Sequence, residues 1–255
     1  MSGTEIWSQV QQAVHSGNAE KVKHVYTAHQ QPYTITAGKG GWNVLHYAAY
    51  HGKLAVVRHV VESGVSVNSR TRDGWTAVYL ACVFGRTDVV RYLWEQGADV
   101  TIPSYSGGNT PLHVAANGNN VDTARCLVRT CGVDVDVCAN SGSTPLHSAA
   151  RYGQLDTVQC LIEELNADID VKDSMGRSPL AYAVSEGEVG TVRYLCSFAH
   201  NQSPEMFKLY YEDAKAEFER SDYSGIEVRG EEMDMLLVEI SNEVFRASKN
   251  GMFAK

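Results

Sequence analysis

The sequence predicts an all-α solenoid, built from short helix pairs that are joined by β-hairpin-like turns. One observation behind this prediction is a heptapeptide that recurs along the chain: TPLHVAA at 110–116 returns as TPLHSAA at 144–150. The other is the order of turn glycines, capping residues and apolar pairs, which is the same in each copy. With 255 residues, 44% apolar and 20% charged, the chain is long and apolar enough to bury the core of such an array.

Five copies of the heptapeptide define the repeats. A close copy, NVLHYAA, starts at Asn43, and weaker copies start at Thr76 and Ser178. The starts at positions 43, 76, 110, 144 and 178 follow one another at a nearly constant period. This spacing predicts five repeats, at about 41–73, 74–107, 108–141, 142–175 and 176–200. Residues 1–40 are expected to form an atypical N-terminal capping repeat, because one face of a terminal repeat meets water.

Each copy predicts the same sequence of local structures. A glycine closes a turn in each copy, and a Thr or Ser two residues later can cap a helix; a proline follows the cap in three copies. Paired alanines such as Ala115 and Ala116 then let a neighbouring helix approach closely. A second helix follows, with apolar residues at helical spacing. On one of these second helices, Trp94 is expected in the core beside Leu93.

This pattern resembles the ankyrin repeat, whose TPLH signature stands nearly intact at 110–113 and 144–147. The resemblance covers about residues 41–200 and implies a scaffold that binds proteins on a concave face. It also implies a structural role for the signature histidines His46, His113 and His147. Spaced one per repeat, they would lie roughly 10 Å apart, whereas one metal ion needs its ligands at about 2 Å. We therefore expect no metal and no other cofactor.

Residues 201–255 depart from the repeat pattern and predict an acidic helical C-terminal extension. This segment holds 12 acidic and 7 basic residues, so −5 of the net charge of −8 lies here. Ser203 and Pro204 are expected to begin one helix, and a second helix carries apolar residues such as Leu236 and Ile240. We expect the extension to seal the end of the stack; the alternative is a second binding element.

Composition and motifs exclude several classes of function. A net charge of −8 disfavours nucleic-acid binding, and no run of about 18 apolar residues predicts a membrane span. The sequence has no visible signal peptide, so its six cysteines are expected to be thiols of a cytoplasmic or nuclear protein. No GxSxG, HExxH or kinase-type motif occurs, and the extension is too short for a catalytic domain. We therefore expect that the protein is not an enzyme.

Aromatic residues gather where the repeat frame places the concave face. Core positions are already filled by Val, Leu and Ala, so folding does not require large rings there. The predicted partner-binding residues are Trp42, Tyr50, His51, Arg70, Arg72, Trp75, Phe84, Tyr105, Arg151, Tyr152 and Arg177. The arginines would pair with carboxylates, so the predicted partner is a protein with an apolar, partly acidic segment.

The sequence leaves alternatives open for the role of the aromatic residues and for the role of the whole chain. The aromatic residues could instead pack on one another along the groove. The chain could also be, instead of an adaptor, a permanent structural subunit or assembly chaperone of a cytoskeletal or proteasome-type complex. A regulatory subunit or inhibitor of a separate enzyme is the third possibility, because each role would use the same groove with a different partner.

Overall fold

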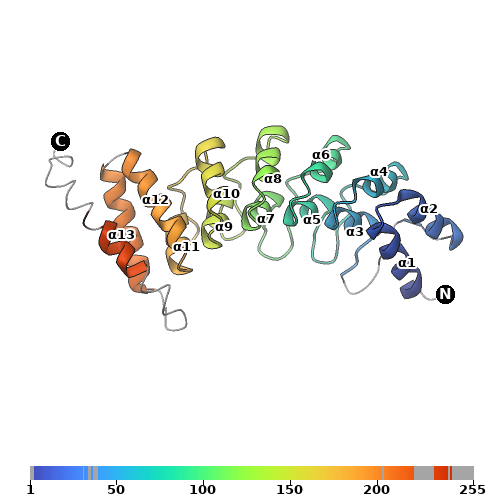
Figure 1. Ribbon diagram of the computed structural model, residues 1–255, viewed down its shortest axis with the longest axis horizontal. Coiled ribbons are helices and arrows are strands. Elements are labelled where there is room, and N and C mark those ends of the chain that lie inside the picture. The colour runs from blue at the N-terminus through green and yellow to red at the C-terminus, as the bar shows by residue number, and fades with distance from the viewer. Residues whose placement is uncertain are drawn as a thin grey trace.

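The structure is a computed structural model that describes residues 3–30, 32–33, 36, 40–202, 204–220, 233–240 and 242. Its helices form pairs that are stacked along one direction, from the N-terminal pair to the C-terminal helices (Figure 1). No strand occurs within these ranges. The prediction of an all-α repeat solenoid is therefore confirmed.

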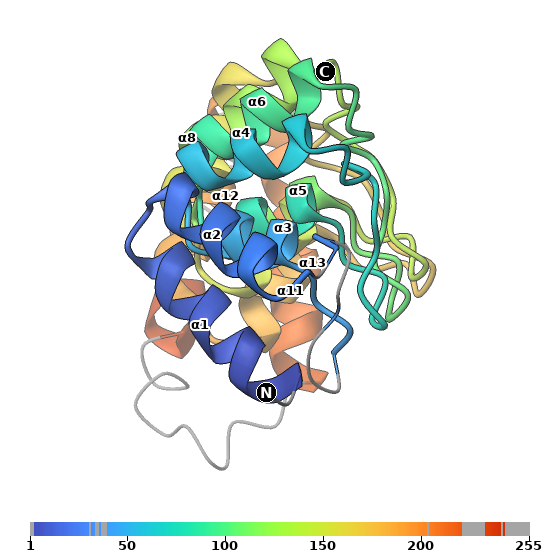
Figure 2. The same cartoon turned by 90° about the vertical axis from the view of Figure 1, so that its right-hand side faces the viewer.

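The helices form two tiers, one above the other in Figure 1. The array opens with α1 (Gly3–His15) and α2 (Ala19–Ala28). The inner tier consists of α3 (Val44–Tyr50), α5 (Ala77–Val83), α7 (Pro111–Asn117), α9 (Pro145–Arg151) and α11 (Pro179–Ser185). The outer tier consists of α4 (Leu54–Glu62), α6 (Thr87–Glu95), α8 (Val121–Arg125), α10 (Leu155–Gln159) and α12 (Val189–Gln202). Seen along the array, the hairpin turns project together to one side of both tiers (Figure 2).

Small residues let the inner helices stack closely. The alanine pair of α7, Ala115 and Ala116, is fully buried between α5 and α9. Leu112, one turn earlier on the same helix, is also fully buried, as are Leu146 of α9 and Leu180 of α11. Each of these inner helices therefore contributes large and small side chains to the layer between repeats, which favours close packing.

One additional residue lengthens the hairpin of the repeat formed by α5 and α6. In the hairpin that precedes α5, the Thr71 N–H donates to the Trp75 carbonyl (2.9 Å), four residues on. In the hairpin that precedes α7, the Ser104 N–H donates to the Asn109 carbonyl (2.9 Å), five residues on. The extra residue in this turn explains why the step from the heptapeptide at 76 to that at 110 is one longer than the step from 43 to 76.

In the next two repeats, the additional residue lies in the outer helix. There α8 and α10 continue into single π-helical turns, η1 (Cys126–Thr130) and η2 (Cys160–Glu164). These wider turns are closed by bonds from the Cys131 N–H to the Cys126 carbonyl (3.1 Å) and from the Leu165 N–H to the Cys160 carbonyl (3.0 Å). A π-helical turn absorbs one inserted residue without breaking the helix.

The prediction that Trp94 lies in the core is wrong. Its side chain is 37% exposed on the outer tier, whereas the adjacent Leu93 is fully buried. The buried face of α6 is made by Val89, Val90, Tyr92 and Leu93. Trp94 follows Leu93 by about 100° around the helix and therefore points past this face.

The described part of the C-terminal extension packs on the last repeat. Helix α13 (Pro204–Arg220) contacts α11 and α12, and helical residues 233–240 add Met233 and Leu236 to the same apolar cluster as Leu195. An ion pair of 2.9 Å joins Arg193 to Glu239. The predicted cap Ser203 lies outside the described residues. Within the described ranges, none of the helices has the length and hydropathy that crossing a bilayer requires.

Candidate functional site

Side-chain caps position the inner helices and join each one to the next repeat. At the start of α7, the Thr110 N–H donates to Nδ1 of His113 (3.3 Å). Because Nδ1 accepts, the ring proton lies on Nε2, which donates to the Ser143 carbonyl of the next hairpin (2.9 Å). His147 of α9 makes the same link to the Arg177 carbonyl (3.0 Å). The signature histidines therefore fix the spacing of the concave face and are buried as neutral groups.

Four predicted aromatic residues form one cluster on this face. The ring centroid of Trp42 lies 5.5 Å from that of Tyr50 and 6.4 Å from that of Trp75. Tyr50 in turn lies 4.2 Å from Phe84 of the next repeat. These edge and tilted contacts are the geometries that aromatic pairs favour. The rings therefore pack on one another along the groove, which was the alternative to a free binding surface. They also leave space between them.

That space is a groove of about 380 Å³ across the inner helices α3, α5 and α7. We call it the aromatic groove; it is lined by Trp42, Tyr50, Trp75, Tyr79, Leu80, Val83, Phe84, Val114, Asn117 and Gly118. Its lining is mainly apolar, and Phe84 is 40% exposed at its edge. The groove can therefore receive an apolar group from outside without rearrangement of the helices.

Tyr79 belongs to the aromatic groove but was absent from the predicted residues. It stacks under Trp75 with centroids 6.0 Å apart and ring planes 5° from parallel. In the repeat frame, Tyr79 occupies the place of the signature histidine, because TAVY at 76–79 stands where TPLH stands in the later copies. The same frame that located the tryptophans could have located this residue.

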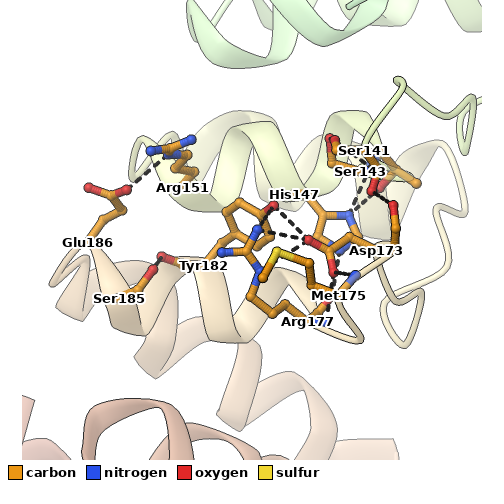
Figure 3. A network of polar contacts seen from close by, with 12 residues as sticks. Ser141, Ser143, His147, Arg151, Asp173, Met175, Arg177, Tyr182, Ser185 and Glu186 are labelled. Atoms are coloured by element: carbon orange, nitrogen blue, oxygen red, sulfur yellow. Dashed lines mark hydrogen bonds and ion pairs between the residues drawn. The ribbon is translucent and has the colours of Figure 1, made fainter. Parts of the chain in front are cut away.

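The C-terminal half of the concave face is polar and bonded internally (Figure 3). Arg177 lies 3.0 Å from the Asp173 carboxylate and stacks over the Tyr182 ring at 4.3 Å. The Tyr182 hydroxyl donates to Asp173 (2.8 Å). Burial raises the pKa of Asp173, but the N–H groups of Arg177 and Met175, the Tyr182 hydroxyl and the guanidinium outweigh it and lower the pKa to about 2. This network holds the last hairpin on α11.

A second cavity of about 530 Å³ lies beside this network and is lined mainly by polar groups, including Asn109, Ser143 and Ser148. Arg151 and Tyr152, both predicted site residues, stand at its edge. Arg151 pairs with Glu186 of the next repeat (2.9 Å), and Tyr152 is 51% exposed. The concave face therefore has an apolar half over α3 to α7 and a polar half over α7 to α11.

The remaining predicted residues lie on the hairpin tips and at the end of α3. Arg70 donates to the Gly74 carbonyl (3.0 Å) and stacks over the Tyr105 ring at 4.2 Å. Arg72 is exposed on the same tip. His51 ends α3, with its ring 4.6 Å from that of Tyr50. The structure thus brings Trp42, Tyr50, His51, Trp75 and Phe84 together and places the arginines in other contacts.

Stacked helix pairs with hydrogen-bonded hairpins define a repeat scaffold with one extended concave surface. In the part of the chain that the structure describes, no three His, Cys, Asp or Glu side chains gather as a metal site requires. The family model of ankyrin repeats (3 copies) matches residues 10–104 and 112–208, and the chain therefore belongs to the ankyrin repeat family. Ankyrin repeats generally mediate protein–protein interaction. The chain matched none of the curated proteins in a sequence comparison.

Proposed function

We propose that this chain is a non-catalytic adaptor that binds a partner protein on its concave face, with an apolar side chain of the partner in the aromatic groove. The observation that carries the proposal is the groove itself, in which Trp42, Tyr50, Trp75 and Phe84 surround open space. Their mutual contacts hold the rings in place before a partner arrives, so that binding costs little conformational entropy. Trp and Tyr are also enriched among residues that dominate binding energy.

The polar half of the face supports an extended partner segment rather than a single side chain. Hydrogen-bonding groups continue from Asn117 to Ser148 and Arg151 beyond the aromatic groove. An apolar, partly acidic segment fits this surface, with its apolar part over α3 to α7. We propose a cytoplasmic or nuclear location, supported by six free thiols and testable by imaging the tagged chain.

The test is peptide selection on the full chain. Random dodecapeptides displayed on phage are selected on the wild type, and the affinities of the enriched peptides are measured as synthetic peptides. Phe84→Ala should weaken their binding about 30-fold or more, since loss of a central anchor residue costs about 2 kcal/mol. Trp94→Ala is the matched control, because Trp94 is similarly exposed but lies on the outer tier. Equal binding to wild type and to Phe84→Ala, with circular dichroism unchanged, would refute the proposal.

A further inference from the structure

One position of the repeat changes its charge along the array. It is the residue directly before the outer helix, which is Lys53 before α4 and Arg86 before α6. In the following repeats the same position is Asn120, Gln154 and Glu188. The charge at this position therefore runs from positive in the N-terminal repeats through neutral to negative at the C-terminal end.

The fold does not need the positive charge at this position. Asn120 donates from Nδ2 to the Cys82 carbonyl at the end of α5 (2.9 Å), and Gln154 donates from Nε2 to a carbonyl at the end of α7 (2.9 Å). Arg86 makes the corresponding bond from Nε to the Tyr50 carbonyl at 3.4 Å. A neutral amide thus performs the structural task, and the charge of Arg86 is additional to it.

Two histidines lie beside this positive end. We call His15, His51, Lys53 and Arg86 the basic cluster; the ring centroids of His15 and His51 lie 4.4 Å apart. Burial lowers the pKa of His51, and the charges of His15, Lys53 and Arg86 lower it further. Among the described residues, no carboxylate lies within ion-pair distance of Lys53 or Arg86. The described chain therefore leaves these two charges unneutralised.

The basic cluster borders the aromatic groove. Tyr50 lines the groove and is followed by His51, whose ring lies 4.6 Å away. Phe84 lines the groove as well, and Arg86 follows it after one glycine. The predicted cations Arg151 and Arg177, in contrast, pair with Glu186 and Asp173 of this chain. Lys53 and Arg86, which were not among the predicted partner-binding residues, therefore add positive charge beside the aromatic groove.

The following inference rests on the proposed function. We propose that the partner segment carries an aspartate or glutamate next to its apolar anchor. Lys53 and Arg86 bind this carboxylate while the aromatic groove holds the anchor. Charge complementarity selects this occupant, because a basic segment would be repelled at the same place. The charge gradient also orients the segment, since the position before the outer helix is cationic only at the N-terminal end of the array. A guanidinium and an ammonium together favour a carboxylate at short distance.

The phage-selected dodecapeptides are the probe. Peptides enriched on the full chain should carry Asp or Glu within a few residues of their apolar anchor. Replacing that acid by its amide should weaken binding to the wild type about fivefold to tenfold. In the Lys53→Gln/Arg86→Gln variant, the same replacement should change the affinity less than twofold. Glutamine is the replacement of choice because Gln154 fills the equivalent position in the fourth repeat.

A charge-matched variant separates local binding from the overall field of the protein. Arg58→Gln/Arg91→Gln removes the same charge from the outer helices α4 and α6 and should retain the full dependence on the acid. Peptides that lose affinity in Phe84→Ala but show no acid dependence would overturn this inference and leave the proposed function standing. Peptides unaffected by Phe84→Ala, or a selection that enriches none, would overturn both.

Discussion

Acidification from pH 7.5 to 5.5 is expected to destabilise the array through its capping histidines. Neutral His113 accepts a bond from the Thr110 N–H at Nδ1 and donates from Nε2 to the Ser143 carbonyl. A proton added at Nδ1 would face the Thr110 N–H, so protonation breaks the cap and also charges a side chain that is 1% exposed. Burial accordingly lowers the pKa of His46, His113 and His147 below 6.5.

The size of the effect follows from proton linkage. A histidine whose pKa is lowered in the folded state binds more protons in the unfolded state below pH 6.5, so stability falls as the pH falls from there to the folded-state pKa. One pH unit below 6.5, a histidine that stays neutral when folded destabilises the chain by about 1.4 kcal/mol. The three histidines together therefore set an upper limit of about 4 kcal/mol at pH 5.5.

Urea unfolding of the full chain, followed by circular dichroism at pH 7.5, 6.5 and 5.5, measures this loss. The His113→Gln/His147→Gln variant should be less stable at pH 7.5 by about 1 to 3 kcal/mol and should show only about a third of the pH dependence. His24→Gln removes an exposed histidine of α2 and serves as the matched control. The reasoning is refuted if the unfolding midpoint is the same at pH 7.5 and 5.5, or if the double variant keeps the pH dependence of the wild type.

Three further predictions concern the polar network and the repeat turns. Tyr182→Phe removes the hydroxyl that donates to Asp173 and should lower the free energy of unfolding in urea by about 1 kcal/mol. The pKa of Asp173 is lowered from 3.8 to about 2, so the ionised carboxylate contributes about 2 kcal/mol to the free energy of unfolding above pH 3.8. This contribution is lost as the pH falls through 2. The acid unfolding curve of Asp173→Asn should therefore lack this step. Asn166, with a φ of 58°, should tolerate Gly, whereas Asn166→Ala should destabilise the chain by about 1 kcal/mol in thermal unfolding.

The fold is predictable from the sequence because each repeat is specified by its own residues. The cap Thr110, the proline after it and the buried Ala115 act within one or two turns of helix, so their spacing is readable along the chain. The position of the additional residue within each of the longer repeats is harder to predict from the spacing of these residues. A longer hairpin at Ser104 and a π-helical turn at Cys126 give the same period, so the period alone does not distinguish them.

The candidate site is predictable in its aromatic part and less so in its charged part. Trp42 and Trp75 follow turn glycines, and the repeat frame alone places both on the concave face. An ion pair such as Arg151 with Glu186 joins residues of two repeats, 35 positions apart. Whether an arginine meets such a partner depends on the stagger and twist between successive repeats, which composition and spacing do not contain. The structure accordingly groups the rings of Trp42, Tyr50, Trp75 and Phe84, whereas Arg151 and Arg177 form ion pairs within the chain.

The repeat scaffold separates positions that maintain the stack from positions that can vary. His113 accepts a bond within its own repeat and donates one to the next, so its replacement removes both bonds. At the residue before the outer helix, Asn120, Gln154 and Arg86 each donate one bond to the end of the preceding inner helix. Because an amide satisfies this position, a charge there changes the surface without changing the fold. We therefore expect Arg86→Gln to alter peptide affinity while leaving the unfolding midpoint unchanged, the reverse of what His113→Gln should do.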